Sequence, residues 1–211
     1  MAIKVLLTDD HEVVRAGYAR LLESTPDIEV VAEACSGEEA CAGYSEYQPD
    51  VLIMDLNMPG MGGLEACRRI MARDPKANIL VFSVHENDVM LERALDAGIK
   101  GYISKRSASQ VMIQAVRKVA DGDMYVGQEM MSHLIGRRKS EDGEPLKDLT
   151  PREFEVFRLL ADGESVNEIA GILSISPKTV GHHMTHIKDK LGISNIAELT
   201  RLAIRLGISS A

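Results

Sequence analysis

Five polar side chains stand at or just after the ends of short apolar runs, and together they could carry out phosphoryl transfer. They are Asp9, Asp10, Asp55, Ser83 and Lys105. Three carboxylates that lie close together repel one another unless a divalent cation sits among them, and oxygen ligands suit Mg²⁺. A carboxylate beside such an ion can act as a nucleophile toward phosphorus, while the ion and a lysine neutralise the phosphoryl oxygens. The residue types therefore indicate transfer of a phosphoryl group to an aspartate, with the hydroxyl available to bond the new group.

The elements that must position these side chains are apolar runs that alternate with amphipathic stretches. The runs are rich in Val, Ile and Leu without polar alternation, which is typical of parallel strands covered on both faces. We predict strands at Lys4–Thr8, Ile28–Ala34, Val51–Asp55, Ile79–Ser83 and Gly101–Ser104, and helices at Glu12–Glu23, Gly37–Tyr47, Gly63–Arg73, Asp88–Ala97 and Ser107–Asp121. This order predicts an α/β domain with an open, doubly wound parallel sheet of five strands, whose ligands bind at the carboxyl ends of the strands. One such polar residue alone would be an ordinary strand end, but five at matching ends favour a site.

Four segments of this region resemble the receiver domain of response regulators. They are the segment Leu6–His11 with its acidic pair, the segment Val51–Gly63 around Asp55, the pair Phe82-Ser83, and the segment Tyr102–Lys105. The resemblance covers residues 1–122 and implies a flavodoxin-like receiver.

The resemblance also implies a role for each residue of the site. Asp55 would be the phosphoacceptor, and Lys105 would pair with the phosphoryl oxygens. Asp10, Asp55 and the backbone carbonyl of Asn57 would bind Mg²⁺, with Asp9 helping through a water molecule. Ser83 and Tyr102 would be a switch pair that shifts when Asp55 is modified. For Tyr102, plain core packing is the alternative, because aromatic side chains are often simply buried.

Composition bounds the class of protein and its organisation. The chain has 211 residues, which suits one medium and one small domain. We expect a receiver at 1–122, a helix near Gln128–Ile135 followed by a polar linker within 123–147, and a second domain at 148–211.

The net charge of −8 is unevenly placed, with −7 in residues 1–125 and −1 in residues 148–211. No apolar run approaches the length of a membrane helix, so we expect a cytoplasmic protein with no membrane partner. The three cysteines include no Cys-x-x-Cys pair, and we interpret all of them as reduced packing residues.

From Thr150 onward only helical periods remain. Thr150-Pro151 begins a helix with an apolar stripe, and the capping box at Ser165 and Glu168 begins a second at Val166–Leu173. Ser176-Pro177 begins a third, with one apolar face, and a fourth spans Ile196–Leu206. The expected core residues are Phe154, Phe157, Leu160 and Ala161 in the first helix, Val180, Met184, Ile187 and Leu191 in the third, and Leu199, Leu202 and Leu206 in the fourth. Two short helices joined by a tight turn are typical of a helix-turn-helix, although helical periods alone fit a plain bundle equally well.

Four segments of the second domain resemble the LuxR-type DNA-binding domain. They are Leu149–Glu153, Glu168–Ala170, Ser176–Val180 and Ile187–Ile193. A receiver joined to this all-α helix-turn-helix domain is the arrangement of the NarL/FixJ family of response regulators. The resemblance implies a sensor histidine kinase as phosphodonor, double-stranded promoter DNA as target, and homodimers when the receiver is phosphorylated. The candidate DNA contacts, mostly on the polar face of the third helix, are Lys178, Thr179, His182, Thr185, His186 and Lys188.

Three positions on or near that face depart from the family pattern. Gly181, Thr185 and Asn167 stand where cations are common, and each missing cation weakens the attraction to DNA phosphates. His182, His183 and His186 could in principle bind a metal ion, but no neighbouring Cys or carboxylate completes a ligand set. We therefore interpret them as one packed histidine, one surface histidine and one phosphate contact.

Two other functions remain open from the sequence. One is an Mg²⁺-dependent phosphatase that forms an aspartyl-phosphate, although such enzymes usually place a second acid where this chain has Asn57. The other is a constitutive DNA-binding protein or scaffold with a vestigial pocket, against which the complete set of pocket residues argues. We expect a regulator rather than an enzyme, with at most self-phosphorylation and self-dephosphorylation.

Overall fold

The computed structural model describes residues 2–84, 88–107, 109–128, 131, 146, 148–206 and 208. The chain divides into two compact units, Met1–Gly136 and Arg137–Ala211. Most of the helix predicted near Gln128–Ile135 and most of the predicted linker lie outside the described residues. Within the described part of the chain, no helix has both the length and the apolar character needed to cross a membrane.

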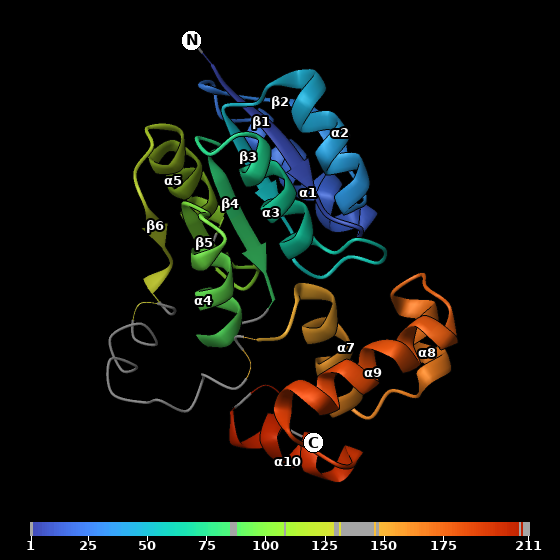
Figure 1. Cartoon of the computed structure of the whole chain (residues 1–211). Helices are drawn as coiled ribbons and strands as arrows, with labels where there is room; N and C mark the ends of the chain where they lie inside the picture. Colours follow the sequence, from blue (N-terminus) through green and yellow to red (C-terminus); the bar gives the residue numbers. More distant parts are fainter. Residues whose placement is uncertain are drawn as a thin grey trace. The chain divides into compact units, whose positions relative to one another are not determined.

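The first unit is built on one parallel sheet with helices on both faces (Figure 1). The strand order is β2-β1-β3-β4-β5-β6, and every recorded pairing is parallel. The strands are β1 (Ile3–Thr8), β2 (Ile28–Ala34), β3 (Val51–Met54), β4 (Ile79–Ser83), β5 (Gly101–Ser104) and β6 (Tyr125–Val126). The helices are α1 (Glu12–Glu23), α2 (Gly37–Tyr47), α3 (Gly63–Arg73), α4 (Asp88–Asp96) and α5 (Ser109–Ala120). The doubly wound parallel sheet is thus confirmed, with element ends within two residues of those predicted.

The prediction of five strands is wrong by one. β6 pairs with β5 through Gly101 with Tyr125 and Tyr102 with Val126. A two-residue strand has no apolar period to reveal it, and it falls in the segment assigned to the helix and linker. Since it extends only the outer edge of the sheet, it leaves the positions of the predicted site residues unchanged.

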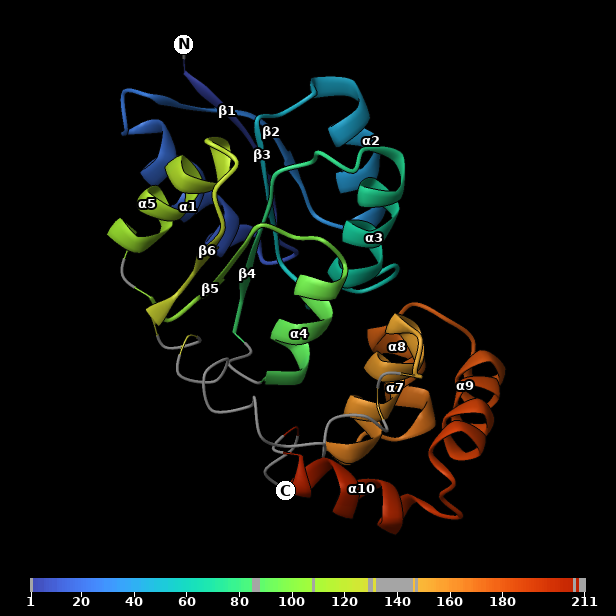
Figure 2. The same ribbon diagram turned by 60° about the vertical axis from the view of Figure 1, so that its left-hand side comes forward.

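The sheet is sandwiched between two helical layers. Figure 2 shows α1 and α5 on one face and α2, α3 and α4 on the other. Val5 and Leu7 of β1 pack into the core shared with α1 and α5, together with Val51 and Ile53 of β3. Leu6 points the other way, toward Gly43 of α2. Because successive strand residues face opposite layers and both layers are packed, the strands β3, β4 and β5 contain almost no polar residues before their carboxyl ends. β1 and β2 differ, since they carry the exposed residues Lys4, Glu29 and Glu33.

The second unit consists of four helices in its described part, α7 (Pro151–Ala161), α8 (Val166–Ile172), α9 (Pro177–Leu191) and α10 (Ile196–Arg205). Thr150 and Ser165 form complete capping boxes, Ser176 caps α9, and Gly192 ends α9 in the left-handed conformation with φ of 63°. These caps set the ends of the helices where the sequence places them. Most of the expected core residues are buried, whereas Met184, Leu191 and Leu206 are only partly buried.

The burial of the cysteines differs in part from expectation. Cys35 is exposed, so the interpretation of all three cysteines as packing residues is wrong at that position, while Cys67 is buried and Cys41 is intermediate. The exposed side chain lies in the segment that joins β2 to α2, where no second layer covers it.

The start of α3 approaches the end of β3 so closely that only glycine fits. A Cβ added to Gly63 would lie 1.9 Å from the carbonyl oxygen of Asp55, whereas one added to Gly17 of α1 would meet nothing within 4 Å. We expect Gly63→Ala to lower the free energy of unfolding of the first unit by about 3 kcal/mol or more, because backbone must move. Gly17→Ala, at an exposed helical position, should raise it by about 0.5–1 kcal/mol.

Tyrosine fluorescence during urea unfolding of the full chain measures both changes. All five tyrosines, Tyr18, Tyr44, Tyr47, Tyr102 and Tyr125, lie in the first unit, and the chain has no tryptophan. A Gly63→Ala protein as stable as the unmodified one would contradict the account of this loop.

Candidate functional site

The predicted acidic site forms at the carboxyl edge of the sheet. Asp9 and Asp10 follow β1, and Asp55 follows β3 on the neighbouring strand, in register through Thr8 and Met54. The Lys105 ammonium, just past β5, lies 2.6 Å from Asp55 Oδ2 and 2.5 Å from Asp9 Oδ2. The structure therefore brings these four side chains together, as parallel strands ending at one edge require.

Burial makes an unpaired charge in this pocket costly. Asp9 and Asp55 are each 1% exposed, and buried carboxylates need cationic partners or hydrogen bonds. Burial raises the pKa of the Asp55 carboxyl above its ordinary value, although Lys105 opposes this change. Burial alone would lower the pKa of Lys105, but its ion pairs and hydrogen bonds with Asp55 and Asp9 raise it. Lys105 is therefore held as a cation between two carboxylates.

The donor set fits a divalent cation. Asp9, Asp10, Asp55 and His11 each offer a ligand atom, and these atoms all lie within 4.8 Å of one another. Asp10 Oδ1 is buried and lies 2.9 Å from His11 Nδ1, without the alignment of a hydrogen bond. One ammonium does not balance the charge of three carboxylates, so a divalent cation would neutralise the two negative charges that are left. The Asn57 N–H donates to Asp55 Oδ1 at 3.1 Å, which places this predicted residue at the pocket as well.

Two side chains that the sequence analysis did not single out, Arg15 and Tyr18, help to hold the pocket in place. The Lys105 ammonium lies 5.6 Å from the centre of the Phe82 ring, and Tyr18 packs edge-on against that ring with centroids 4.5 Å apart. Arg15 Nη1 donates to the Asp9 carbonyl at 2.7 Å. Arg15 and Tyr18 lie on α1, and no local motif marks them, because their roles depend on the packing of α1 beside β1.

The predicted switch residues lie on neighbouring strands and are fully buried. Ser83 ends β4, and its carbonyl accepts a hydrogen bond from the Lys105 N–H at 2.8 Å. Tyr102 lies opposite Val81 on β5 and is 0% exposed. Ser83 is thus joined to the pocket through Lys105, and the position of Tyr102 is compatible with both core packing and a switching role.

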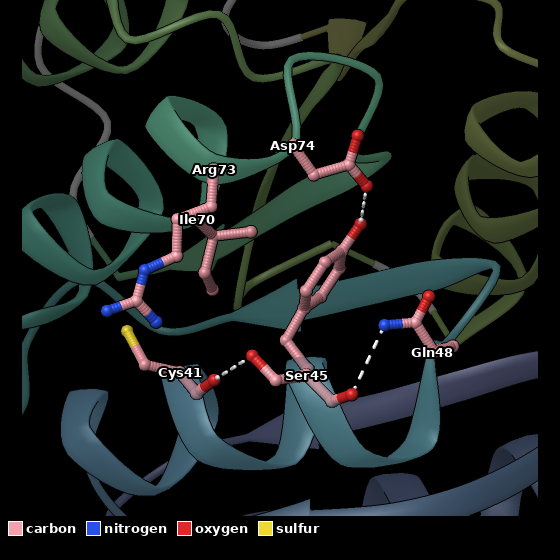
Figure 3. Close-up of a pocket in the computed structure, with 7 residues that line it drawn as sticks. Cys41, Ser45, Gln48, Ile70, Arg73 and Asp74 are labelled. Carbon is pink, nitrogen blue, oxygen red and sulfur yellow. Dashed lines mark hydrogen bonds between the residues drawn. The ribbon is translucent and has the colours of Figure 1, made fainter.

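A separate hollow of about 250 Å³ lies between α2 and α3 (Figure 3). Tyr44 on α2 donates to Asp74 Oδ2 at 2.8 Å, and Gln48 Nε2 donates to the Ser45 carbonyl at 3.2 Å. Burial and this hydrogen bond raise the pKa of Tyr44 above its ordinary value. Since these polar groups already have partners, the hollow is a packing seam between two helices.

The candidate DNA contacts lie on α9 of the second unit. Val180 and Ile187 are buried, whereas Lys178, Thr179, His182, Thr185 and His186 are exposed and Lys188 is partly buried. The Thr185 hydroxyl donates to the Gly181 carbonyl at 3.1 Å. Most of the predicted residues thus stand on the polar side of one amphipathic helix, available to a partner.

A buried glutamate anchors α9 to α7, and the sequence analysis treated it only as part of a motif. Glu153 is 3% exposed and accepts hydrogen bonds at 2.7 Å from Lys190 Nζ and from the Thr150 N–H. Burial by itself would raise the pKa of Glu153, but these hydrogen bonds and the charge of Lys190 lower it to about 2. The first turn of α7 is thereby tied to the last turn of α9.

This anchor predicts a pH-dependent contribution to stability. The lowered pKa means that Glu153 stabilises the folded state above its ordinary pKa of 4.5, and that this contribution is lost as pH falls from 4.5 toward 2. Glu153→Gln should therefore cost up to about 3 kcal/mol at neutral pH and progressively less below pH 4.5. Scanning calorimetry of the full chain measures this loss of stability in the unfolding transition of the second unit. That transition is not reported by tyrosine fluorescence, because all five tyrosines lie in the first unit.

Glu164→Gln is the matched control, because the partly exposed Glu164 side chain has no ion pair or hydrogen bond among the described residues. An equal loss for Glu153→Gln at neutral and acidic pH would show that its charge is not what stabilises the fold.

Comparison with known proteins agrees with this geometry. Residues 5–117 match the response regulator receiver domain, and residues 147–203 match the luxR family of bacterial regulatory proteins. Response regulator UvrY of Escherichia coli K12 is 40% identical over 99% of this chain and 97% of its own length. Response regulator GacA of Pseudomonas aeruginosa is 36% identical over 99% of each chain.

Solved structures give the same result. RcsB of Salmonella enterica serovar Typhimurium, bound to promoter P1flhDC with the phosphomimetic BeF3-, is similar over 100% of both chains, with 28% identity and a TM-score of 0.69. The matched receiver alone covers more than half of this chain, and the luxR-type match follows it. The chain therefore belongs to the NarL/FixJ family of two-component response regulators.

Proposed function

We propose that a sensor histidine kinase phosphorylates Asp55 and that this modification controls the binding of α9 to double-stranded promoter DNA. The observation that carries the proposal is the Lys105 ammonium between Asp55 and Asp9, at 2.6 and 2.5 Å. Such a cation can exchange a carboxylate oxygen for a phosphoryl oxygen without leaving the pocket. The site is therefore prepared for an anion to arrive at Asp55.

In the proposed reaction, an Asp55 carboxylate oxygen attacks phosphorus in a phosphohistidine of the kinase. The O–P bond forms as the N–P bond breaks, and the released imidazole takes up a proton from solvent. Lys105 neutralises one of the phosphoryl oxygens, which otherwise meet the carboxylate of Asp9. Small phosphodonors could serve in the same way, and water could later cleave the acyl phosphate. The protein is thus a regulator that takes part in its own modification.

We propose Mg²⁺ as the cofactor, held by the carboxylates of Asp10 and Asp55 and the backbone carbonyl of Asn57, with Asp9 acting through water. It would supply the positive charge that lets a phosphoryl group approach three carboxylates. The close grouping of ligand atoms and the net negative charge of the pocket support this assignment. His11, whose side chain is 65% exposed, stands at the rim of the same group.

Ser83 and Tyr102 are the proposed route from the pocket to the rest of the protein. Both are fully buried on adjacent strands, and the backbone of Ser83 is bonded to that of Lys105. In the proposed switch the Ser83 hydroxyl bonds the new phosphoryl group, and Tyr102 repacks into the space that this movement leaves. A packed core favours such discrete rearrangements over gradual ones.

The second unit is the proposed DNA-binding part, with α9 in the major groove. RcsB, 28% identical with a TM-score of 0.62, has been solved in a complex with DNA, and two RcsB dimers have been solved bound to two parallel DNAs. We propose the same kind of target and a homodimer for this chain, acting in the cytoplasm. Gly181, Thr185 and Asn167 offer no cation to phosphates, so affinity should depend strongly on dimerisation.

DNA binding with and without phosphorylation tests the proposal. Binding of the full chain to genomic DNA fragments should tighten by about 5- to 150-fold with acetyl phosphate and Mg²⁺, since the free energy of coupling between two sites is typically about 1–3 kcal/mol. With or without the phosphodonor, the Asp55→Asn protein should bind DNA with the affinity of the unphosphorylated wild-type chain. Asp121→Asn, an exposed carboxylate at the end of α5, should respond like the wild type.

Other outcomes separate the alternatives. Binding that ignores both acetyl phosphate and Asp55→Asn would show a constitutive DNA-binding protein. Multiple turnovers of a phosphorylated small molecule would show a phosphatase, and no binding under either condition would overturn the assignment of the second unit to DNA.

A further inference from the structure

His182 and His186 form a close pair on the exposed side of α9. They lie four residues apart, so their side chains project from the same side of the helix one turn apart. Their ring centroids are 4.2 Å apart, and the ring planes meet at 57°. Both residues are exposed, and the His186 side chain is 46% exposed. Two imidazoles are therefore within reach of one another and of solvent.

A carboxylate from another helix stands behind one of these rings. Glu153 Oε1 of α7 lies 3.4 Å from His186 Nδ1. Glu153 is otherwise fixed by Lys190 and the Thr150 N–H, so its position does not depend on His186. A negative charge at this distance favours the tautomer with the proton on Nδ1, which leaves the Nε2 lone pair free. Metal-binding histidines commonly have such a carboxylate at their second nitrogen.

We propose that His182 and His186 bind a divalent transition-metal ion, with Zn²⁺ as the probe, through one ring nitrogen of each. Imidazole suits Zn²⁺, and two histidines at this spacing on a helix can bind one ion from the same side. Water would fill the remaining coordination positions. The helix also presents charges of both signs nearby, with Lys178 one turn before the pair and Asp189 one turn after it. The proposal does not depend on DNA binding.

The sequence alone argues against a metal site here because it shows no Cys or carboxylate that completes a ligand set with the histidines. The structure changes that conclusion, since Glu153 precedes His186 by 33 residues and reaches it only through the packing of α7 on α9. The acidic pocket is a different kind of site, because it offers mainly carboxylate oxygens and suits harder ions.

The test is a titration of the full chain with Zn²⁺ in the presence of excess Mg²⁺ and without DNA. Two-dimensional ¹H–¹⁵N spectra of the imidazoles report each histidine separately, so binding elsewhere does not obscure the result. We expect a ring nitrogen of His182 and one of His186 to shift together along one binding curve. His182→Gln or His186→Gln should weaken that binding at least tenfold, and Glu153→Gln should weaken it about tenfold or more.

His183→Gln is the matched control, because His183 is the partly buried histidine between the other two. It should leave the Zn²⁺ affinity of the pair within twofold, and the same spectra show whether each variant is folded. The proposal is overturned if His182 and His186 do not respond, if they respond with different affinities, or if the response of one survives substitution of the other.

Discussion

The structure of the receiver depends on keeping one ammonium group between two buried carboxylates. Lys105 meets Asp9 and Asp55 in a place where neither carboxylate can rely on water. Removing one partner from such a group leaves an uncompensated charge, which is far more costly than losing an exposed ion pair. The rest of the first unit can be understood as the framework that delivers these three side chains, from three different strands, to one point.

Parallel strands and one close loop provide that framework. β1, β3 and β5 all end at the same edge, so side chains that are far apart in the sequence converge without long loops. Gly63 then lets α3 begin almost against the Asp55 carbonyl. The Phe82 ring forms an apolar side of the pocket beside the Lys105 ammonium, and Tyr18 packs edge-on against that ring and holds it in place. Packing thus determines the electrostatics of the site.

Much of the fold and the acidic site could be predicted from the sequence, because both depend on short-range patterns. Buried strands appear as apolar runs, and helix caps such as Thr150 and Ser165 mark their own positions. Contacts between residues of different helices and strands leave no such short-range pattern in the sequence. The contact of Tyr18 with Phe82 and that of Glu153 with His186 both need the tertiary arrangement, and β6 is too short to carry a period.

The central claim is that Asp55 receives the phosphoryl group. Treatment of the full chain with acetyl phosphate and Mg²⁺, followed by borohydride, converts an aspartyl phosphate into homoserine, which mass spectrometry locates in the sequence. The account predicts homoserine at position 55 and at no other aspartate, and none without the phosphodonor. Homoserine at position 9 or 10, or its absence everywhere under conditions that phosphorylate a known receiver, would contradict it.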